Sequence, residues 1–381
     1  MEHHEVSGAA AAPPVLDGYA DLPTPQALIE LEIAERNIAR MAERLRRAGI
    51  RHRPHIKTSK SVTWARKQLE AGAIGISVAK LAEAEVFAAA GIRELLIAYP
   101  IIGAPQLRRF AALHAGGGEL LTTIDSLTGA RGLSDVGVAA GRPVQALIEI
   151  DGGLHRGGRQ PGEDTLRFAL EAMELPGLQI RGVMNYAGTI YRNTSPAGFI
   201  AAVQEEARQL AASVALLREH GIDTGIVSSG STPSALYCEH LQGVTEVRAG
   251  NYLYFDASGV ALGLAAEADC ALRVLATVVS TPCPGRATID AGTKTLTSDK
   301  AHNRAGHGIV VGRPDLRIEG LNEEHGFIVY DPQEGRLTVG DRLLIIPNHS
   351  CVIPNLYDAL PGVRGGRVTE RIAVEARGCN Y

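Results

Sequence analysis

The sequence predicts an α/β protein that consists of a (β/α)8 barrel of the TIM type and a smaller all-β domain. From about residue 27 to residue 256, short apolar runs alternate with longer segments of helical periodicity, which is typical of parallel α/β architectures. About eight such units fit a closed barrel, and no GxGxxG segment follows the first run, which argues against an open dinucleotide-binding sheet. After about residue 268 the sequence changes to β-branched runs separated by Gly, Pro and Asp.

The barrel strands are expected at 27–32, 52–58, 74–79, 94–99, 120–125, 144–151, 179–186 and 226–231, with 246–255 extending the last unit. The segments between them, such as 33–48, 81–90 and 196–220, are rich in Ala, Leu, Glu and Arg and are expected to be helical. Strands of the second domain are expected at 271–280, 287–290, 326–330, 342–346 and 368–374. We therefore assign residues 24–262 to the barrel and residues 268–381 to a β-rich domain, which residues 12–23 could join.

The bulk composition excludes several classes of protein. The chain has 381 residues, 45% of them hydrophobic and 21% charged, which suits a two-domain globular enzyme. A net charge of -4 without a basic stripe argues against nucleic acid as a partner. No run of about 18 apolar residues predicts a membrane span, and no apolar leader indicates secretion. Five scattered cysteines without a CxxC pair indicate a reducing, cytoplasmic setting.

The segment RPHIKTSK, at residues 53–60, lies where the second barrel strand should end. Catalytic groups of such barrels come from the carboxyl ends of strands. A partly desolvated Lys57 would have a lowered pKa and could form a Schiff base, although a lone lysine at a strand end is more often a solvated surface residue. His55 shares a strand face with Lys57, so it could orient a bound ring or be a packed structural histidine.

The segment VSSGSTPS, at residues 227–234, ends the last predicted strand and opens a short helix. The backbone N–H groups of a Gly/Ser turn at a helix N terminus can bind a phosphate group, and barrels commonly hold phosphate near their last strands. The segment RAGNY, at residues 248–252, follows closely enough to complete the site. The alternative is an ordinary Ser-Gly turn with a helix cap.

Two further segments carry candidate ligands. In EIDGGLHRGG, at residues 149–158, Arg156 could donate to a phenolate oxygen of a cofactor or form a loop salt bridge to Asp151. In PNHSC, at residues 347–351, an extended backbone would place His349 and Cys351 on one face, which suits Zn²⁺ with open coordination positions. The alternative for Cys351 is a buried, unreactive cysteine. The stretch that contains His307 is expected to be a long loop near a functional region.

Together these four segments resemble the fold-type III pyridoxal phosphate enzymes, and within them the D-serine dehydratase and D-threonine aldolase group, over roughly residues 23–378. The resemblance implies an alanine racemase-like barrel, a D-serine dehydratase-like C-terminal domain and a head-to-tail homodimer. It implies that Lys57 holds pyridoxal 5'-phosphate and that His349 and Cys351 hold a divalent metal, with Zn²⁺ favoured by the thiolate and Mn²⁺ as the alternative. The other cofactor-binding residues that it implies are Arg156, Tyr186, Ser229, Gly230, Ser231, Thr232, Gly250, Asn251 and Tyr252.

The expected reaction is a lyase reaction on D-configured 3-hydroxy amino acids, with dehydration of a D-serine or D-threonine type of substrate to a 2-oxo acid and ammonia favoured. The aldolases that the chain resembles carry a histidine after the tyrosine of a YHG-like segment and an HxD metal pair, whereas this chain has Ala187 after Tyr186 and an HxC pair. Against dehydration, the segments 355–358 and 376–378 look more like the aldolase branch, and His307 could replace the missing base. Retro-aldol cleavage therefore stays open, as do a racemase and a non-catalytic pyridoxal phosphate protein.

Overall fold

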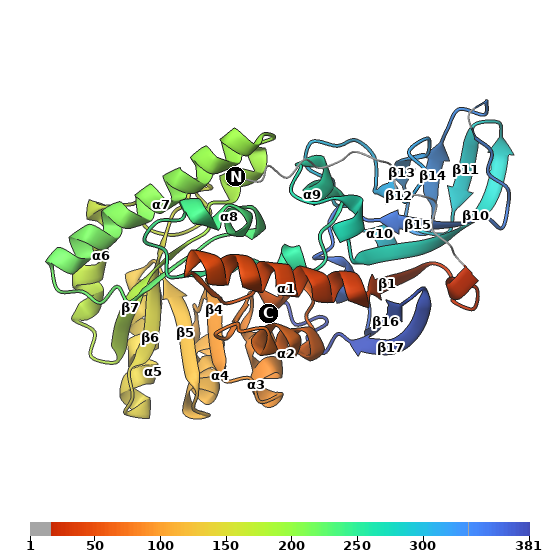
Figure 1. Cartoon of the computed structure of the whole chain (residues 1–381). Helices are drawn as coiled ribbons and strands as arrows, with labels where there is room; N and C mark the ends of the chain where they lie inside the picture. The colour runs from red at the N-terminus through yellow and green to blue at the C-terminus, as the bar shows by residue number, and fades with distance from the viewer. Residues whose placement is uncertain (1–16, 334) are drawn as a thin grey trace. The chain divides into compact units, whose positions relative to one another are not determined.

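The computed structural model describes residues 17–333 and 335–381. The contacts within the chain divide it into two compact units (Figure 1). The barrel unit contains Ala39–Gly250 and Gly378–Tyr381, and the β unit contains the described residues of Met1–Ile38 and Asn251–Arg377. No helix of the described residues is long and apolar enough to cross a membrane.

The barrel unit contains a sheet of eight parallel strands in the order β2-β9-β8-β7-β6-β5-β4-β3. The strands are β2 (Arg51–His52), β3 (Ile76–Val78), β4 (Glu94–Pro100), β5 (Glu119–Ile124), β6 (Val144–Ile150), β7 (Leu178–Asn185), β8 (Ile226–Ser229) and β9 (Glu246–Val247). A parallel bridge between His55 and Ser77 joins the two ends of this order, and Ser77 N donates to Pro54 O at 2.8 Å. The predicted TIM-type barrel is thereby confirmed.

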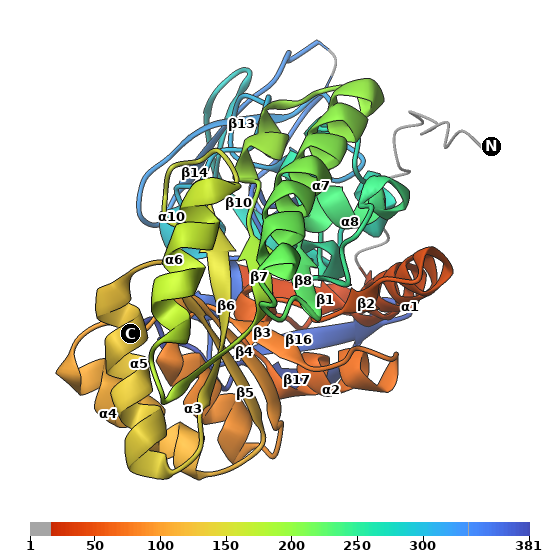
Figure 2. The same ribbon diagram turned by 90° about the vertical axis from the view of Figure 1, so that its left-hand side faces the viewer.

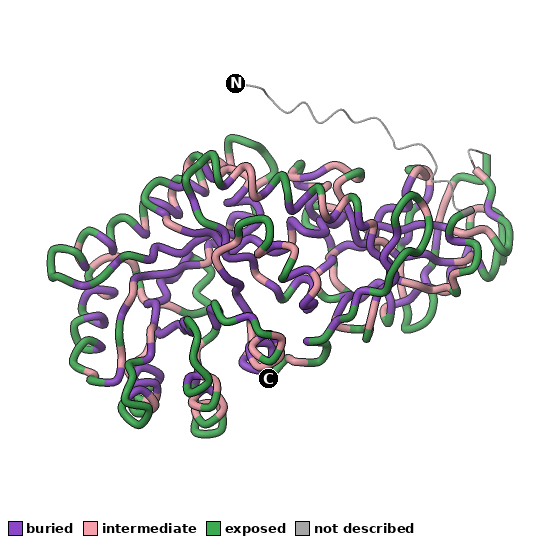
Figure 3. Tube along the Cα trace, turned by 60° about the horizontal axis from the view of Figure 1, so that its bottom comes forward, coloured by how far each residue is buried: buried purple, intermediate pink, exposed green. Residues whose placement is uncertain are grey.

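Helices cover the outer face of the barrel strands; Figure 2 shows α4, α5 and α6 outside β4 to β6. The helices in and leading into this unit are α1 (Leu31–Ala48), α2 (Val62–Glu70), α3 (Leu81–Ala89), α4 (Ala104–Ala115), α5 (Leu127–Ala140), α6 (Glu163–Met173), α7 (Pro196–Glu219) and α8 (Thr232–Leu236). Figure 3 shows the strands buried and the helices exposed on one side. Burial on both faces explains the apolar runs in strands such as β4 and β6. One cluster of buried apolar side chains comes from the neighbouring strands β4 to β8 and contains Leu96, Leu121, Leu147, Met184 and Ile226.

The β unit contains a nine-stranded sheet in which the pairing of β1 with β16 is parallel and every other described pairing is antiparallel. Its strands are β1 (Gln26–Glu30), β10 (Leu272–Cys283), β11 (Arg286–Ile289), β12 (Ile309–Val310), β13 (Arg317–Leu321), β14 (Gly326–Val329), β15 (Arg342–Ile346), β16 (Ala359–Arg364) and β17 (Arg367–Ala373). Two short helices, α9 (Ala257–Ala261) and α10 (Thr293–Leu296), belong to the same unit. The predicted all-β second domain is confirmed as a mostly antiparallel sheet domain.

One strand was assigned to the wrong sheet by its sequence pattern. The segment 27–32 was expected to be the first barrel strand, but β1 pairs with β10 and β16 in the β unit. Ala27, Leu28 and Ile29 are all fully buried, and most residues of the barrel strands are buried as well, so an apolar run cannot distinguish the two sheets. The eighth barrel strand is instead β9, which the sequence indicated only as an extension.

Part of the segment 12–23, which was expected to join the second domain, lies outside the described residues. Its described part, from Asp17 on, belongs to the β unit and begins with a 3-10 turn, Asp17–Tyr19. There the Arg342 guanidinium donates to Tyr19 O at 2.6 Å and to Leu22 O at 2.5 Å. These bonds tie the start of the described chain to β15.

Candidate active site

Lys57 lies in a single 3-10 turn, η2 (Ile56–Thr58), that follows β2 at the carboxyl end of the barrel. The side chain of His55 caps this turn, because its Nδ1 accepts a hydrogen bond from Lys57 N at 3.4 Å. Burial lowers the pKa of His55 well below its usual value, and the positive charges of Lys57, Arg248 and Arg156 lower it further. A neutral imidazole can accept at Nδ1, so His55 fixes the backbone of the turn from which the exposed Lys57 extends.

Several predicted site residues meet at this end of the barrel. Arg156 follows β6, Arg248 follows β9, and both lie near enough to His55 to act on its pKa. The guanidinium carbon of Arg156 lies 4.9 Å from the centre of the Tyr186 ring, which follows β7. Because parallel strands end at one edge of a barrel, residues far apart in the sequence share one mouth. The structure thus brings Lys57, His55, Arg156 and Tyr186 together.

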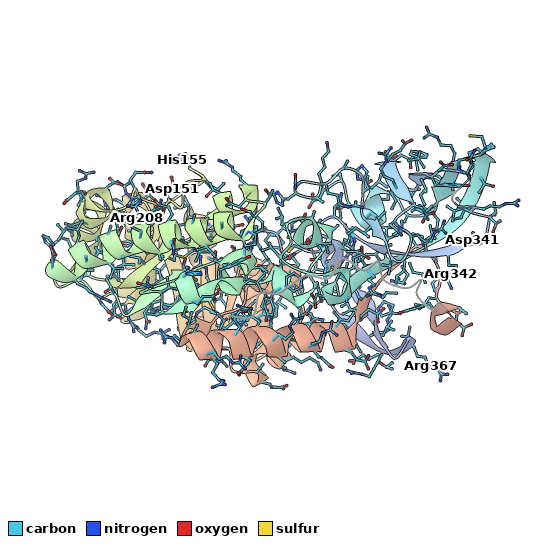
Figure 4. The ribbon with its side chains drawn as sticks, turned by 45° about the horizontal axis from the view of Figure 1, so that its top comes forward. Asp151, His155, Arg208, Asp341, Arg342 and Arg367 are labelled. Carbon is cyan, nitrogen blue, oxygen red and sulfur yellow. The ribbon has the colours of Figure 1, made fainter. Side chains whose placement is uncertain are left out.

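Arg156 is not paired with Asp151, which was the alternative to a ligand role. Its guanidinium instead lies 3.9 Å from the Glu149 carboxylate, and its side chain is 61% exposed. Asp151 is instead bound by His155, whose Nδ1 lies 2.5 Å from Asp151 Oδ2; Figure 4 shows the two side chains next to each other. Burial raises the pKa of Glu149, and the nearby Arg156 and Arg248 oppose that rise. Arg156 is therefore an available cation at the barrel mouth.

The predicted phosphate loop is built around a buried carboxyl group. Glu206 in α7 is 1% exposed; its Oε1 accepts from Gly230 N at 3.0 Å and from the Ser229 hydroxyl, and its Oε2 accepts from the Ser234 hydroxyl at 2.8 Å. Gly230 has φ 88°, a left-handed conformation that favours glycine. Ser229 and Gly230 thus shape the loop through Glu206, and the backbone around Ser231 and Thr232 opens α8.

Gly250 closes the mouth through a close approach of two backbones. A Cβ atom at this position would lie 2.5 Å from His55 O and 3.1 Å from Thr58 Oγ1. The site therefore needs glycine here, next to the turn that carries Lys57. The next two predicted residues lie in another 3-10 turn, η5 (Asn251–Leu253), in the β unit, where Tyr252 is 1% exposed.

The predicted metal pair follows β15 in the β unit. His349 Nδ1 lies 2.8 Å from Asp299 Oδ2, and the side chain of His349 also has a hydrogen bond with Cys351. The Cys351 thiolate raises the pKa of His349 to about 10, with smaller contributions from Asp256 and Asp299 and an opposing one from burial. Among the described residues, no three His, Cys, Asp or Glu side chains are grouped so as to hold a metal. An imidazole and a thiolate with open positions nevertheless fit a borderline-soft divalent ion.

A network of amide side chains holds this segment in place. Asn251 Nδ2 donates to Asp256 Oδ2 at 2.8 Å and to Cys351 Sγ at 3.6 Å, so the amide of Asn251 contacts one residue of the predicted metal pair. Asn348 Nδ2 donates to Asp299 O at 3.0 Å and to Gly306 O at 2.8 Å. These bonds connect the loop that carries Asp299 to the segment that carries His349.

His307 lies in the same loop region of the β unit. Its backbone N–H donates to Ile318 O at 2.9 Å, and its Nδ1 is buried without a hydrogen-bond partner among the described residues. Burial lowers the pKa of His307, and the charge of Lys300 lowers it further. His307 is therefore a neutral imidazole near physiological pH.

Sequence reasoning missed four residues that support the site: Asp256, Asp299, Glu206 and Asn348. Only Glu206 carried a usable signal, since it is the one acidic residue on the mostly apolar, buried face of α7. The other three lie in loops, where no periodicity marks a buried side chain.

Two family models match the chain: the alanine racemase N-terminal domain over residues 29–258 and a putative serine dehydratase domain over residues 271–363. A D-threo-3-hydroxyaspartate dehydratase of Delftia sp. (strain HT23) is 37% identical over 353 residues, which cover 88% of this chain and 92% of the relative. The chain belongs to the alanine racemase N-terminal domain family.

Relatives with two different reaction names share both parts of this architecture. A D-threonine aldolase of Arthrobacter sp. is 33% identical over 99% of both chains. The crystal structure of a D-threonine aldolase from Filomicrobium marinum superposes with a TM-score of 0.88 at 30% identity, covering 98% of this chain and all of that one. The dehydratase from Delftia sp. HT23 superposes with a TM-score of 0.86 at 36% identity, covering 93% and 98%.

These matches confirm the family that the four motifs indicated, namely fold-type III pyridoxal phosphate enzymes of the D-serine dehydratase and D-threonine aldolase group. Dehydratases and aldolases are lyases, so the prediction of a lyase is confirmed as well. Alanine racemases, at 16% identity and a TM-score of 0.67, share the fold alone.

Proposed function

We propose that the chain is a pyridoxal phosphate- and divalent metal-dependent lyase that acts on D-3-hydroxy amino acids and dehydrates a D-serine or D-threonine type of substrate. The observation that carries this proposal is the gathering of Lys57, Arg156 and Tyr186 at one barrel mouth, in a chain whose relatives are named D-threo-3-hydroxyaspartate dehydratase, D-serine dehydratase and D-threonine aldolase. The exposed Lys57 is the residue that would hold the cofactor.

The barrel unit fits this cofactor in three respects. Lys57 offers an amine on a turn that the His55 cap fixes, and Arg156 offers a permanent donor for a phenolate oxygen. Gly230 gives the predicted phosphate loop a left-handed turn without a side chain, and Gly250 lets the backbone approach the turn that carries Lys57. When bound, pyridoxal phosphate supplies an electron sink for the α-carbon of the substrate. The Lys57 amine would remove the α-proton as general base.

His349 and Cys351 are the residues that would hold the metal. A divalent ion there would supply a Lewis acid for the 3-hydroxyl group. The thiolate favours Zn²⁺ over Mn²⁺. A related structure, described as a variant of the D-threo-3-hydroxyaspartate dehydratase in a metal-free form, supports a metal in this family. Asp299 would fix the ring of His349, as carboxylates commonly do for metal-binding histidines.

The absence of an acid or base side chain at Ala187 favours dehydration over retro-aldol cleavage, because cleavage needs a base for the hydroxyl proton. The second candidate is D-threonine aldolase activity to glycine and an aldehyde. One observation favours it: His307 is neutral with a buried, unpaired Nδ1 among the described residues, as a base must be. The similarity to the Filomicrobium marinum aldolase supports the same alternative.

Product analysis with D-threonine distinguishes these reactions. Dehydration gives 2-oxobutyrate and ammonia, retro-aldol cleavage gives glycine and acetaldehyde, and a racemase inverts the α-carbon. We expect 2-oxobutyrate, lost on chelation and restored by Zn²⁺. Replacement of Lys57 by Ala should remove both the visible absorbance of bound cofactor and turnover, whereas Lys67→Ala, on α2, should change neither. Turnover by the Lys57 variant would contradict its assigned role.

We further propose a cytoplasmic, head-to-tail homodimer that binds a small D-amino acid and neither nucleic acid nor membrane. The family resemblance supports the dimer, and the cysteine pattern supports the compartment. We keep a barrel domain, predicted at 24–262, and a β-rich metal-binding domain, predicted at 268–381, as part of this proposal, with residues 26–38 and 251–262 moved to the β-rich domain because the compact units group them there. Analytical ultracentrifugation would test the dimer, and limited proteolysis would test the domain boundary.

A further inference from the structure

Lys60 lies three residues after Lys57 in the same motif, but its side chain is buried rather than exposed. It is 5% exposed, and its backbone has φ 51°, a left-handed conformation that is uncommon for residues other than glycine. Its N–H donates to Ile56 O at 2.8 Å, and Ser59 N donates to the same oxygen at 3.0 Å. Such a conformation persists only where the surroundings fix it. The end of the Lys57 turn is therefore held from outside the turn.

The first group that holds it is a buried carboxylate. Lys60 Nζ lies 2.9 Å from Oε1 of Glu83, which is fully buried. Glu83 Oε2 accepts from Ala79 N at 2.6 Å and from Lys80 N at 3.2 Å, where α3 begins. The ion pair thus joins the loop after β2 to the loop after β3. A buried ion pair is sensitive to the loss of either partner, because the remaining charge is left without compensation.

The second group comes from the other end of the sequence. Lys60 Nζ donates to Asn380 Oδ1 at 3.1 Å and to Cys379 O at 3.4 Å. Tyr381 O accepts from Ala82 N at 3.1 Å, and the guanidinium carbon of Arg109 lies 4.9 Å from the centre of the Tyr381 ring. Residues 378–381 belong to the barrel unit, although the chain up to Arg377 belongs to the β unit.

We propose that residues 379–381 form a C-terminal strap that holds the Lys60 ammonium, and that Lys60 is the positioning residue of the turn that carries Lys57. The strap supplies two acceptors to an ammonium that has three N–H donors. It also caps the first turn of α3, because Tyr381 O accepts from Ala82 N, and Glu83 caps the start of the same helix. Loss of the strap would remove two acceptors from the buried ammonium. The strained backbone at Lys60 would then relax, and the direction in which Lys57 extends would become less defined.

A pair of nearly isosteric variants separates the hydrogen bond from mere packing. Asn380→Leu removes the acceptor for Lys60 Nζ, whereas Asn380→Asp keeps an oxygen there. In the full-length protein without cofactor, we expect Asn380→Leu and Lys60→Met to speed hydrogen exchange at the amides of Ser59 and Lys60 by about tenfold, which corresponds to ~1.4 kcal/mol. Asn380→Asp and the exposed control Lys294→Met, whose partner is Glu324, should exchange as the wild type does.

The catalytic consequence rests on the proposed function and is measured separately. With D-threonine, Asn380→Leu and Lys60→Met should lower kcat by about 10- to 100-fold, as small misplacements of a reacting group do, with little change in KM. Their combination should be no worse than Lys60→Met alone, since both act through one ammonium.

Each outcome bears on one proposal. Unchanged exchange at Ser59 and Lys60 in Asn380→Leu, or equal loss in Asn380→Asp, would overturn the strap. A general rise in exchange, including the amides of β6, would show global unfolding and would equally overturn a local positioning role. A wild-type protein that binds no cofactor at Lys57 would overturn the proposed function, and the exchange result at Lys60 would still decide the strap.

Discussion

Replacement of Glu206 by Ala tests the idea that a buried carboxyl group shapes the phosphate loop. The change removes the carboxyl group to which three donors, the Ser229 hydroxyl, the Gly230 N–H and the Ser234 hydroxyl, donate. The Ser229 hydroxyl keeps Asn185 Oδ1 at 2.7 Å, and the Ser234 hydroxyl keeps Ser231 Oγ at 3.1 Å. Gly230 N–H loses the acceptor that it has at 3.0 Å. One unsatisfied buried donor costs about 1–3 kcal/mol and a lost buried methylene about 0.8 kcal/mol, so we expect a destabilisation of roughly 2–4 kcal/mol.

The pH dependence of the Glu206→Gln variant supplies the control. Gln keeps one acceptor oxygen and cannot ionise. The substitution should therefore destabilise the fold by about 1 kcal/mol or less at pH 5. Burial raises the pKa of Glu206 above 4.5, against the lowering by its three hydrogen bonds and Arg248. A carboxyl group with a raised pKa in the folded state stabilises the fold while it is protonated and loses that contribution as the pH rises from 4.5 through the raised value. The difference in unfolding free energy by which wild type is more stable than Glu206→Gln should therefore become smaller between pH 5 and pH 8.

Urea unfolding of both variants and wild type without cofactor, at pH 5 and pH 8, measures these free energies. Cofactor affinity, measured by visible absorbance, should fall with the loss of loop order in Glu206→Ala and stay near wild type in Glu206→Gln. A wild-type advantage over Gln that grows with pH would refute the reasoning, because it would mean that the folded state favours the ionised carboxylate.

Three further changes probe the other parts of the site. Asp299→Asn should weaken metal binding by about 10- to 100-fold in a chelator competition, whereas the control Glu324→Gln, in an exposed ion pair, should leave it unchanged. Equal metal affinities of Asp299→Asn and wild type would show that Asp299 does not orient His349. Gly250→Ala should destabilise the fold by about 1–3 kcal/mol, because the new Cβ would lie 2.5 Å from His55 O. The control Gly320→Ala, whose new Cβ would lie 3.7 Å from the Phe327 ring, should melt at the wild-type temperature. Arg156→Met should raise the pKa of Glu149 beyond the rise that burial already causes, which a carboxyl infrared titration would detect; an unchanged titration would place Arg156 away from Glu149.

The motifs could be read from the sequence because each depends on local chemistry. A lysine after an apolar strand, a Gly/Ser turn before a helix and an HxC pair after another strand mark their positions without knowledge of distant residues. Alternation of strands and helices then predicted that the first motifs share one barrel mouth, since parallel strands end at the same edge. The contacts of His55, Arg156 and Tyr186 agree with that expectation.

Tertiary structure alone decided the partners of these motifs. The apolar run at β1 suits either sheet, and its pairing with β10 depends on residues more than 240 positions away. Glu206, Asp299 and Asn380 reach the motifs from other elements, and their bonds form only once the chain has folded. Local sequence sets which side chains are chemically able to act, whereas burial and long-range packing set which of them are held, charged or neutral.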